Sequence, residues 1–79
     1  MTDGRRLKIE DIEVDLELVK TLRETSPYRI EDIKNILGLK YPASYTRRED
    51  GDVSFKPEEL FLLSRLYDVP LETLFKENS

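Results

Sequence analysis

The chain has 79 residues, of which 38% are hydrophobic and 38% charged, a length and composition that allow one small folded domain. It contains no cysteine and no histidine, which excludes disulfide frameworks, zinc fingers, thiolate nucleophiles and imidazole bases. The formal net charge of −4 argues against a general coat for nucleic acids.

The charges are unevenly distributed along the chain. Residues 26–51 carry five basic and four acidic side chains, whereas residues 1–25 and 52–79 both have an excess of acidic ones. A polyanion, if the chain binds one, is therefore expected on the middle third. The longest apolar run, residues 60–63, is too short to span a bilayer. The two arginines at positions 5 and 6 are not followed by the apolar stretch that a signal peptide needs. We therefore expect no membrane span, no signal peptide and a cytoplasmic location.

Residues 1–14 are predicted to form an N-terminal arm. Apolar and acidic residues alternate over residues 12–16, a period of two that is typical of a short extended segment. Asp15 is a good N-cap, because its carboxylate can accept hydrogen bonds from the free backbone N–H groups of a helix predicted over residues 16–24. This helix ends before Pro27, since the residue before a proline avoids helical angles.

A second helix is predicted over residues 30–37, where one face carries Ile30, Ile33, Ile36 and Leu37. Gly38 follows it and suits a left-handed residue that reverses the chain. Three further helices are expected, each beginning at or near a proline: residues 42–49, a helix from Pro57, and a short helix from Pro70 to Phe75. The sequence thus predicts an all-α domain of five short helices over residues 15–77, preceded by a short extended arm.

The second and third predicted helices form the pattern that points to a function. Two helices separated by a short break that contains glycine are typical of a helix-turn-helix. In the third helix Tyr45 is predicted to face inward, and Ser44, Thr46, Arg47 and Arg48 to face outward. Small polar side chains let a backbone approach base edges, and guanidinium groups reach guanine or phosphate. This pattern favours insertion of the third helix in a major groove.

The chain resembles the Cro/C1-type (XRE) helix-turn-helix family over about residues 16–75. The resemblance rests on four features in the family's order: Gly38-Leu39, Tyr45-Thr46-Arg47-Arg48-Glu49-Asp50-Gly51, the positions Leu60, Leu63 and Tyr67, and Val69-Pro70-Leu71-Glu72-Thr73-Leu74-Phe75. It implies a five-helix, lambda-repressor-like DNA-binding domain, often dimeric and common in phage and prophage regulators. The chain departs from the family's pattern at Lys34, at Ile30 and in a turn that is one residue longer before Pro42.

Matched position by position, the resemblance implies two sets of residues that contact DNA. Those that would read base edges are Tyr41, Ala43, Ser44 and Arg47. Those that would contact phosphates are Arg29, Lys40, Thr46 and Arg48. A second interpretation stays open for two of them, because Arg47 and Arg48 could instead pair with Glu49 or Asp50 on a solvated surface, and the stem of Arg48 could pack along the domain.

A second copy of the chain is also an expected partner. Phe61, Leu62 and Leu66 lie off the inner face of the fourth predicted helix, so we expect an apolar patch that pairs two chains. A two-fold homodimer would place two recognition helices about 34 Å apart on one face of DNA. The alternating residues 9–14 could pair across the same axis. The basic residues Arg5, Arg6 and Lys8 could reach a minor groove or form a disordered basic tail.

Other chemistries lack the residues that they need. The stretch from Asp50 hints at a calcium loop, but Phe55 and Phe61 occupy the positions of its required glycine and glutamate. We expect no enzyme activity, cofactor, metal or small-molecule substrate. The prediction is a sequence-specific regulator of transcription, a repressor that acts by occupying an operator on double-stranded DNA. The alternative is a degenerate helix-turn-helix that binds protein, such as an anti-repressor or inhibitor.

Overall fold

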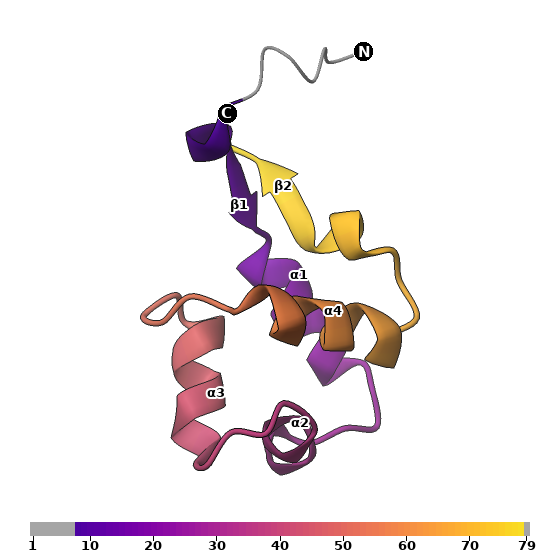
Figure 1. Ribbon diagram of the computed structural model, residues 1–79. Helices are drawn as coiled ribbons and strands as arrows, with labels where there is room; N and C mark the ends of the chain where they lie inside the picture. Colours follow the sequence, from indigo (N-terminus) through magenta and orange to yellow (C-terminus); the bar gives the residue numbers. More distant parts are fainter. Residues whose placement is uncertain (1–7, 79) are drawn as a thin grey trace.

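A computed structural model describes residues 8–78 (Figure 1). Its elements, in chain order, are η2 (Ile9–Asp11), β1 (Ile12–Val14), α1 (Leu16–Glu24), α2 (Ile30–Ile36), α3 (Pro42–Glu49), α4 (Pro57–Leu66), η3 (Leu71–Leu74) and β2 (Phe75–Glu77). The basic residues Arg5 and Arg6, considered above for a minor groove, lie outside the described part. Within it, every helix falls short of the length and apolar character that crossing a membrane requires.

The prediction of a five-helix, all-α fold is wrong. Four α-helices are joined by a two-stranded antiparallel sheet, and the expected fifth helix is a 3₁₀ turn, η3, that leads into β2. The apolar spacing of Leu71, Leu74 and Phe75 resembles one turn of helix, but four residues are too few for an α-helix to gain much from its own hydrogen bonds. Pairing with a strand from the far end of the chain decides their conformation instead.

The sheet ties the two ends of the described chain together. Val14 pairs with Phe75 and Ile12 with Glu77, while Lys76 Nζ lies 3.7 Å from a carboxylate oxygen of Glu13 on the other face. Figure 1 shows this ribbon at one end of the molecule, with α2 and the turn into α3 at the other end and α4 crossing between them. The principal extents are 39 × 24 × 19 Å, so the ribbon lies well away from α2 and α3.

The helix ends follow from capping residues that are visible in the sequence. The Asp15 carboxylate accepts from the backbone N–H of Leu18 at 3.1 Å and begins α1 as expected. Three helices end in the same way, with a residue at positive φ: Gly38 after α2, Gly51 after α3 and Asp68 after α4. In each case two backbone N–H groups beyond the helix return to its last free carbonyls, which is the Schellman arrangement.

The core lies where the four helices meet. Its fully buried side chains come from every α-helix and from η3: Val19, Ile33, Tyr45, Leu63 and Leu74. Phe55, in the loop between α3 and α4, closes the core and packs edge-on against Tyr45, with ring centroids 6.1 Å apart. Burial of Tyr45 fixes which face of α3 points inward, and therefore which residues it presents to solvent.

Candidate nucleic-acid interface

α2 and α3 are joined by a five-residue connection that glycine makes possible. The backbone N–H of Gly38 donates to the carbonyl of Asn35 at 3.1 Å, and that of Leu39 donates to the carbonyl of Lys34 at 2.9 Å. Gly38 has a φ of 72°, a conformation that costs other residues about 1 kcal/mol or more. The chain then leads to Tyr41, the N-cap of α3, and Pro42 takes the first helical position. The two helices pack against each other across this turn.

The inner face of α3 is held to α4 by a buried ion pair. Nε of Arg48 donates to Oε1 of Glu59 at 2.8 Å, and Arg48 also donates to the carbonyl of Ser44 at 2.6 Å. The same Glu59 oxygen accepts from the backbone N–H of Lys56 at 2.9 Å, which caps the start of α4. Arg48 is only 8% exposed. Its guanidinium is therefore committed to the interior and lies away from any surface that could meet a phosphate.

A second ion pair holds the end of α3 to α1. Arg23 donates two hydrogen bonds to the Glu49 carboxylate: Nε donates to Oε2 at 2.7 Å, and a terminal nitrogen donates to Oε1 at 3.1 Å. Burial works against the charge on Glu49, but the hydrogen bonds and the charge of Arg23 outweigh it and hold the pKa of this carboxyl below its ordinary value. The hydrogen bond from Arg23 to Glu49 correspondingly raises the pKa of the guanidinium.

Sequence reasoning missed these two ion pairs, although a signal for them is present. Tyr45, Arg48 and Glu49 stand at i, i+3 and i+4, so one face of α3 carries all three. Once Tyr45 is assigned to the core, the two charged residues must be buried beside it and must find partners. Their partners Arg23 and Glu59 lie 26 and 11 residues away in sequence, which no local pattern reveals.

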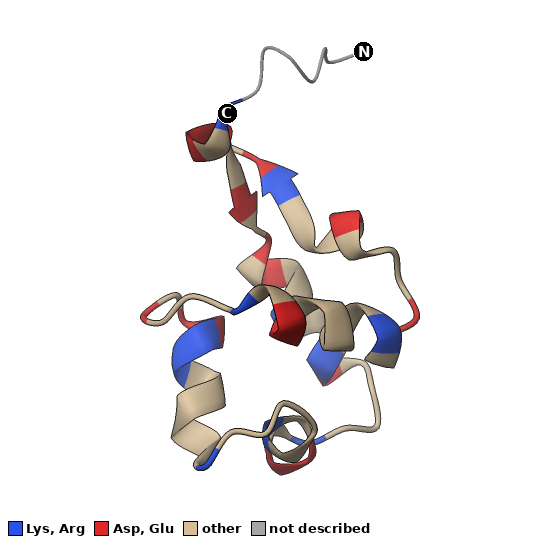
Figure 2. Ribbon diagram, in the orientation of Figure 1, with Lys and Arg blue, Asp and Glu red and all other residues tan. Residues whose placement is uncertain are grey.

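The outer face of α3 and the turn before it carry the predicted base-reading residues. Tyr41 is 58% exposed, and Ala43 and Arg47 are exposed as well. Arg47 forms no ion pair with any residue in the described range. Lys40 is exposed, and its Nζ lies 5.6 Å from the centre of the Tyr41 ring. Figure 2 shows basic residues on α3 and at the turn that precedes it.

The remaining predicted contact residues are placed differently from one another. Arg29 is exposed at the N-cap of α2, where its backbone N–H donates to Asp32 at 2.9 Å. Ser44 is partly buried, and its carbonyl accepts from Arg48. Thr46 is also partly buried and donates its hydroxyl to the carbonyl of Ala43 at 3.1 Å. Five of the predicted contact residues are therefore exposed, Arg29, Lys40, Tyr41, Ala43 and Arg47, whereas Arg48 is buried.

Lys34, which departs from the family's pattern, has its own partner. Its Nζ lies 2.9 Å from Glu31 Oε1, one turn earlier on α2. The Lys34 side chain is 13% exposed, so its aliphatic stem packs at the side of α2. Glu31 thereby offsets the positive charge of Lys34. Among the described residues from Arg29 to Glu49, the cations without an ion pair are Arg29, Lys40 and Arg47.

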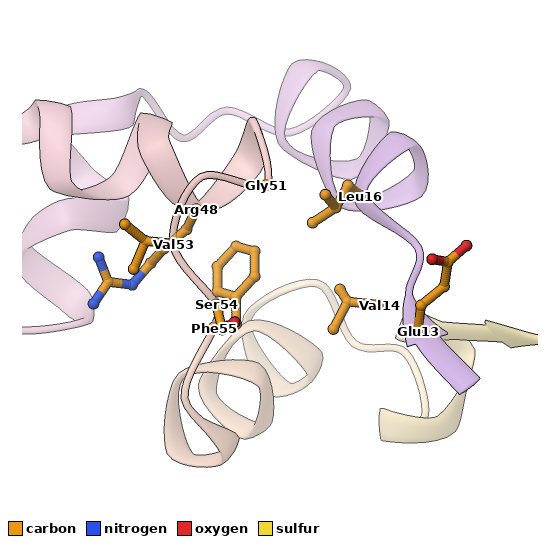
Figure 3. Close-up of a pocket in the computed structure, with 8 residues that line it drawn as sticks. All are labelled: Glu13, Val14, Leu16, Arg48, Gly51, Val53, Ser54 and Phe55. Atoms are coloured by element: carbon orange, nitrogen blue, oxygen red, sulfur yellow. The ribbon is translucent and has the colours of Figure 1, made fainter. Parts of the chain in front are cut away.

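A hollow lies between the start of α1 and the loop after α3 (Figure 3). It has a volume of about 340 Å³, and its walls include Val14, Leu16 and Phe55. The Arg48 guanidinium points away from it, toward α4, because Glu59 holds it there. Apolar side chains make up most of the walls, and Glu13, Arg48 and Ser54 are the polar residues that also line them. Within residues 8–78, histidine, cysteine, aspartate and glutamate form no group of three or more that could hold a metal.

The predicted dimer residues separate into two environments. Phe61 and Leu62 are exposed on α4 and share a surface with Leu71 of η3. Leu66 instead is partly buried and packs against the core, near Leu22.

Comparison with known proteins gave no match: no family model, no curated protein and no solved structure matches this chain.

Proposed function

We propose that this protein binds double-stranded DNA through the outer face of α3 and regulates transcription. The observation that carries the proposal is the contrast between the two faces of α3. The inner face is fixed by Tyr45 and two ion pairs, one buried and one partly buried, whereas the outer face presents Arg47 with no partner in residues 8–78. A rigid helix with an unpaired arginine on its free side suits base recognition in a groove.

The dimensions and chemistry of α3 fit a major groove. Eight residues give a helix about 12 Å long, comparable to the width of the groove. Ala43 is small enough to let the helix approach the bases, and the fork of Arg47 can donate two hydrogen bonds to one guanine. Tyr41, at the N-cap, has a large exposed ring that can contact bases or sugars. We assign the discrimination of bases to Ala43, Arg47 and Tyr41.

Contacts to phosphates position the helix in this proposal. Arg29 is the N-cap of α2, and Lys40 lies in the turn that leads into α3. Such contacts fix register and supply most of the salt-dependent affinity, but they carry little sequence information. The protein would act as a cytoplasmic repressor by occupying an operator and blocking polymerase, without a cofactor or catalysis.

The experiment is selection from random duplex DNA with the purified chain, followed by binding titrations at about 50 and 200 mM salt. Recovery of one enriched motif is expected. Arg47→Ala should lose about 1–3 kcal/mol of affinity on the selected site and much less on random DNA. Arg29→Ala should weaken binding to both DNAs equally and reduce the salt slope by about one.

Lys76→Ala is the matched control, because it removes a positive charge from the ribbon, at the opposite end of the molecule. It should leave affinity and specificity unchanged. If Arg47→Ala weakened binding to selected and random DNA by the same factor, base reading by Arg47 would be wrong. If no DNA were retained even at low salt, the alternative would hold, a helix-turn-helix surface that binds a protein.

A further inference from the structure

One exposed stripe on α4 has a pattern that complements itself. Glu58, Phe61, Leu62 and Arg65 stand at i, i+3, i+4 and i+7, which places all four on one face of the helix. All four are exposed, and Phe61 and Leu62 are 46% and 40% exposed. We call this face the α4 stripe. It is acidic at its beginning, apolar in the middle and basic at its end.

The apolar middle of the α4 stripe is part of a larger surface. Leu71 of η3, 38% exposed, and Pro57 border Phe61 and Leu62 around a shallow hollow of about 520 Å³. Large apolar side chains that gather in this way usually mark an interaction surface, whereas single exposed ones do not. The Arg65 guanidinium lies 5.0 Å from the centre of the Phe61 ring, so the charge stays beside the apolar surface.

We propose that the α4 stripe binds the same stripe of a second copy of this chain, with the two helices antiparallel. In the sequence, the midpoint between Glu58 and Arg65 is also the midpoint between Phe61 and Leu62. A two-fold axis through that midpoint therefore brings Phe61 against Leu62 of the other copy and Glu58 against its Arg65. Each contact occurs twice, which is the requirement for a closed, isologous pair.

The charges select a second copy over another occupant. Glu58 and Arg65 are separated by two helical turns, about 10 Å, which matches the separation of the opposite charges that an antiparallel copy presents. In a parallel arrangement the glutamates would face each other and so would the arginines, which is unfavourable. The pair joins helices of ten residues, so the interface is small and association in the micromolar range is expected.

The test is sedimentation equilibrium of the full chain without DNA, so that its outcome does not depend on DNA binding. The wild type should show a monomer–dimer equilibrium at micromolar concentrations. Glu58→Arg alone and Arg65→Glu alone should each weaken self-association about tenfold or more, because each places like charges at both ends of the stripe. An equal mixture of the two variants should associate as tightly as the wild type, since every charged contact is again between opposites.

Two controls separate this interface from others and from unfolding. Ile9→Asp changes an apolar side chain that is 89% exposed at the ribbon end, and it should leave self-association unchanged. Circular dichroism should show both charge variants folded, and recovery in the mixture could not occur if either were unfolded. A wild type that stays monomeric, a mixture that fails to recover, or a loss of association with Ile9→Asp would each overturn the proposal.

Discussion

Replacing Arg48 tests whether this residue stabilises α3 or contacts DNA. Arg48→Ala would leave the Glu59 carboxylate buried, with the Lys56 N–H as its one remaining hydrogen-bond donor among the described residues. Removal of one partner from a buried ion pair typically costs about 3–5 kcal/mol. A chain of this length has a total stability of about 4–12 kcal/mol. We therefore expect Arg48→Ala to be at the edge of folding.

The assay is urea unfolding followed by circular dichroism, applied as a double-mutant cycle. Its variants are Arg48→Met, Glu59→Gln and the two combined. Glutamine at position 59 can keep the hydrogen bond to the Lys56 N–H, so the cycle isolates the contact with Arg48. The losses in free energy of unfolding of the two single variants should add up to more than the loss of the double variant, because the double variant leaves no buried charge unpaired. The difference, the coupling energy, should be about 2 kcal/mol or more.

The opposite outcome has a clear signature. A phosphate contact at Arg48 predicts an unchanged urea midpoint for Arg48→Ala and a salt slope of DNA binding reduced by about one. That pair of results, or a coupling near zero in the cycle, would refute the assignment of Arg48 to the interior.

Three further substitutions test the packing around α3. Glu49→Gln should make the stability of the protein depend less on pH in the acid range. The pKa of Glu49 is lowered in the folded protein, so its charge adds stability above about pH 4.3, the ordinary value, and this stability is lost as pH falls through the folded pKa. The urea midpoint should therefore drop more between pH 5 and 3 in the wild type than in the variant. Gly51→Ala should cost more than Gly38→Ala in thermal unfolding, because both have positive φ but only at Gly51 would the added Cβ meet a side chain of α1, at 3.2 Å. Tyr45→Phe should lower the free energy of unfolding by no more than about 1 kcal/mol, because the buried hydroxyl makes no close hydrogen bond in the described chain and loses only a weaker interaction with the Glu49 carboxylate; a large loss in calorimetry would contradict this.

The sequence predicts the helices well where their stop signals are local. Leu16–Glu24 and Pro42–Glu49 match the expected spans, and α2 differs by one residue at its end. Asp15, Pro42 and Gly38 act within a few residues of themselves, so their effect can be read from the chain. The error lies at residues 70–77, because β2 exists only through its pairing with β1, about sixty residues earlier.

The candidate interface was predicted less completely than the helices, for a related reason. Exposed Arg47 and buried Arg48 are adjacent and chemically identical, and only the direction of each on α3 separates them. That direction follows from Tyr45, whose inward position the pattern did indicate. The residues that pair with Glu49 and Arg48 lie on α1 and α4. The acidic residues next to Arg48 in the sequence are Glu49 and Asp50, so the sequence does not point to Glu59 as its partner.

In the proposed function, an acidic chain binds DNA because its charges are separated along its length. The molecule extends 39 Å, and the ribbon end carries acidic residues such as Glu10, Asp11 and Glu77, while the unpaired cations Arg29 and Lys40 lie at the N-cap of α2 and in the α2–α3 turn. At about 0.1 M salt the screening length is about 10 Å, so DNA at the turn is shielded from the ribbon. At about 0.01 M it grows to about 30 Å, and the acidic end then repels the duplex. A plot of log affinity against log salt should therefore flatten at the lowest salt, and a line that stays straight there would contradict this account.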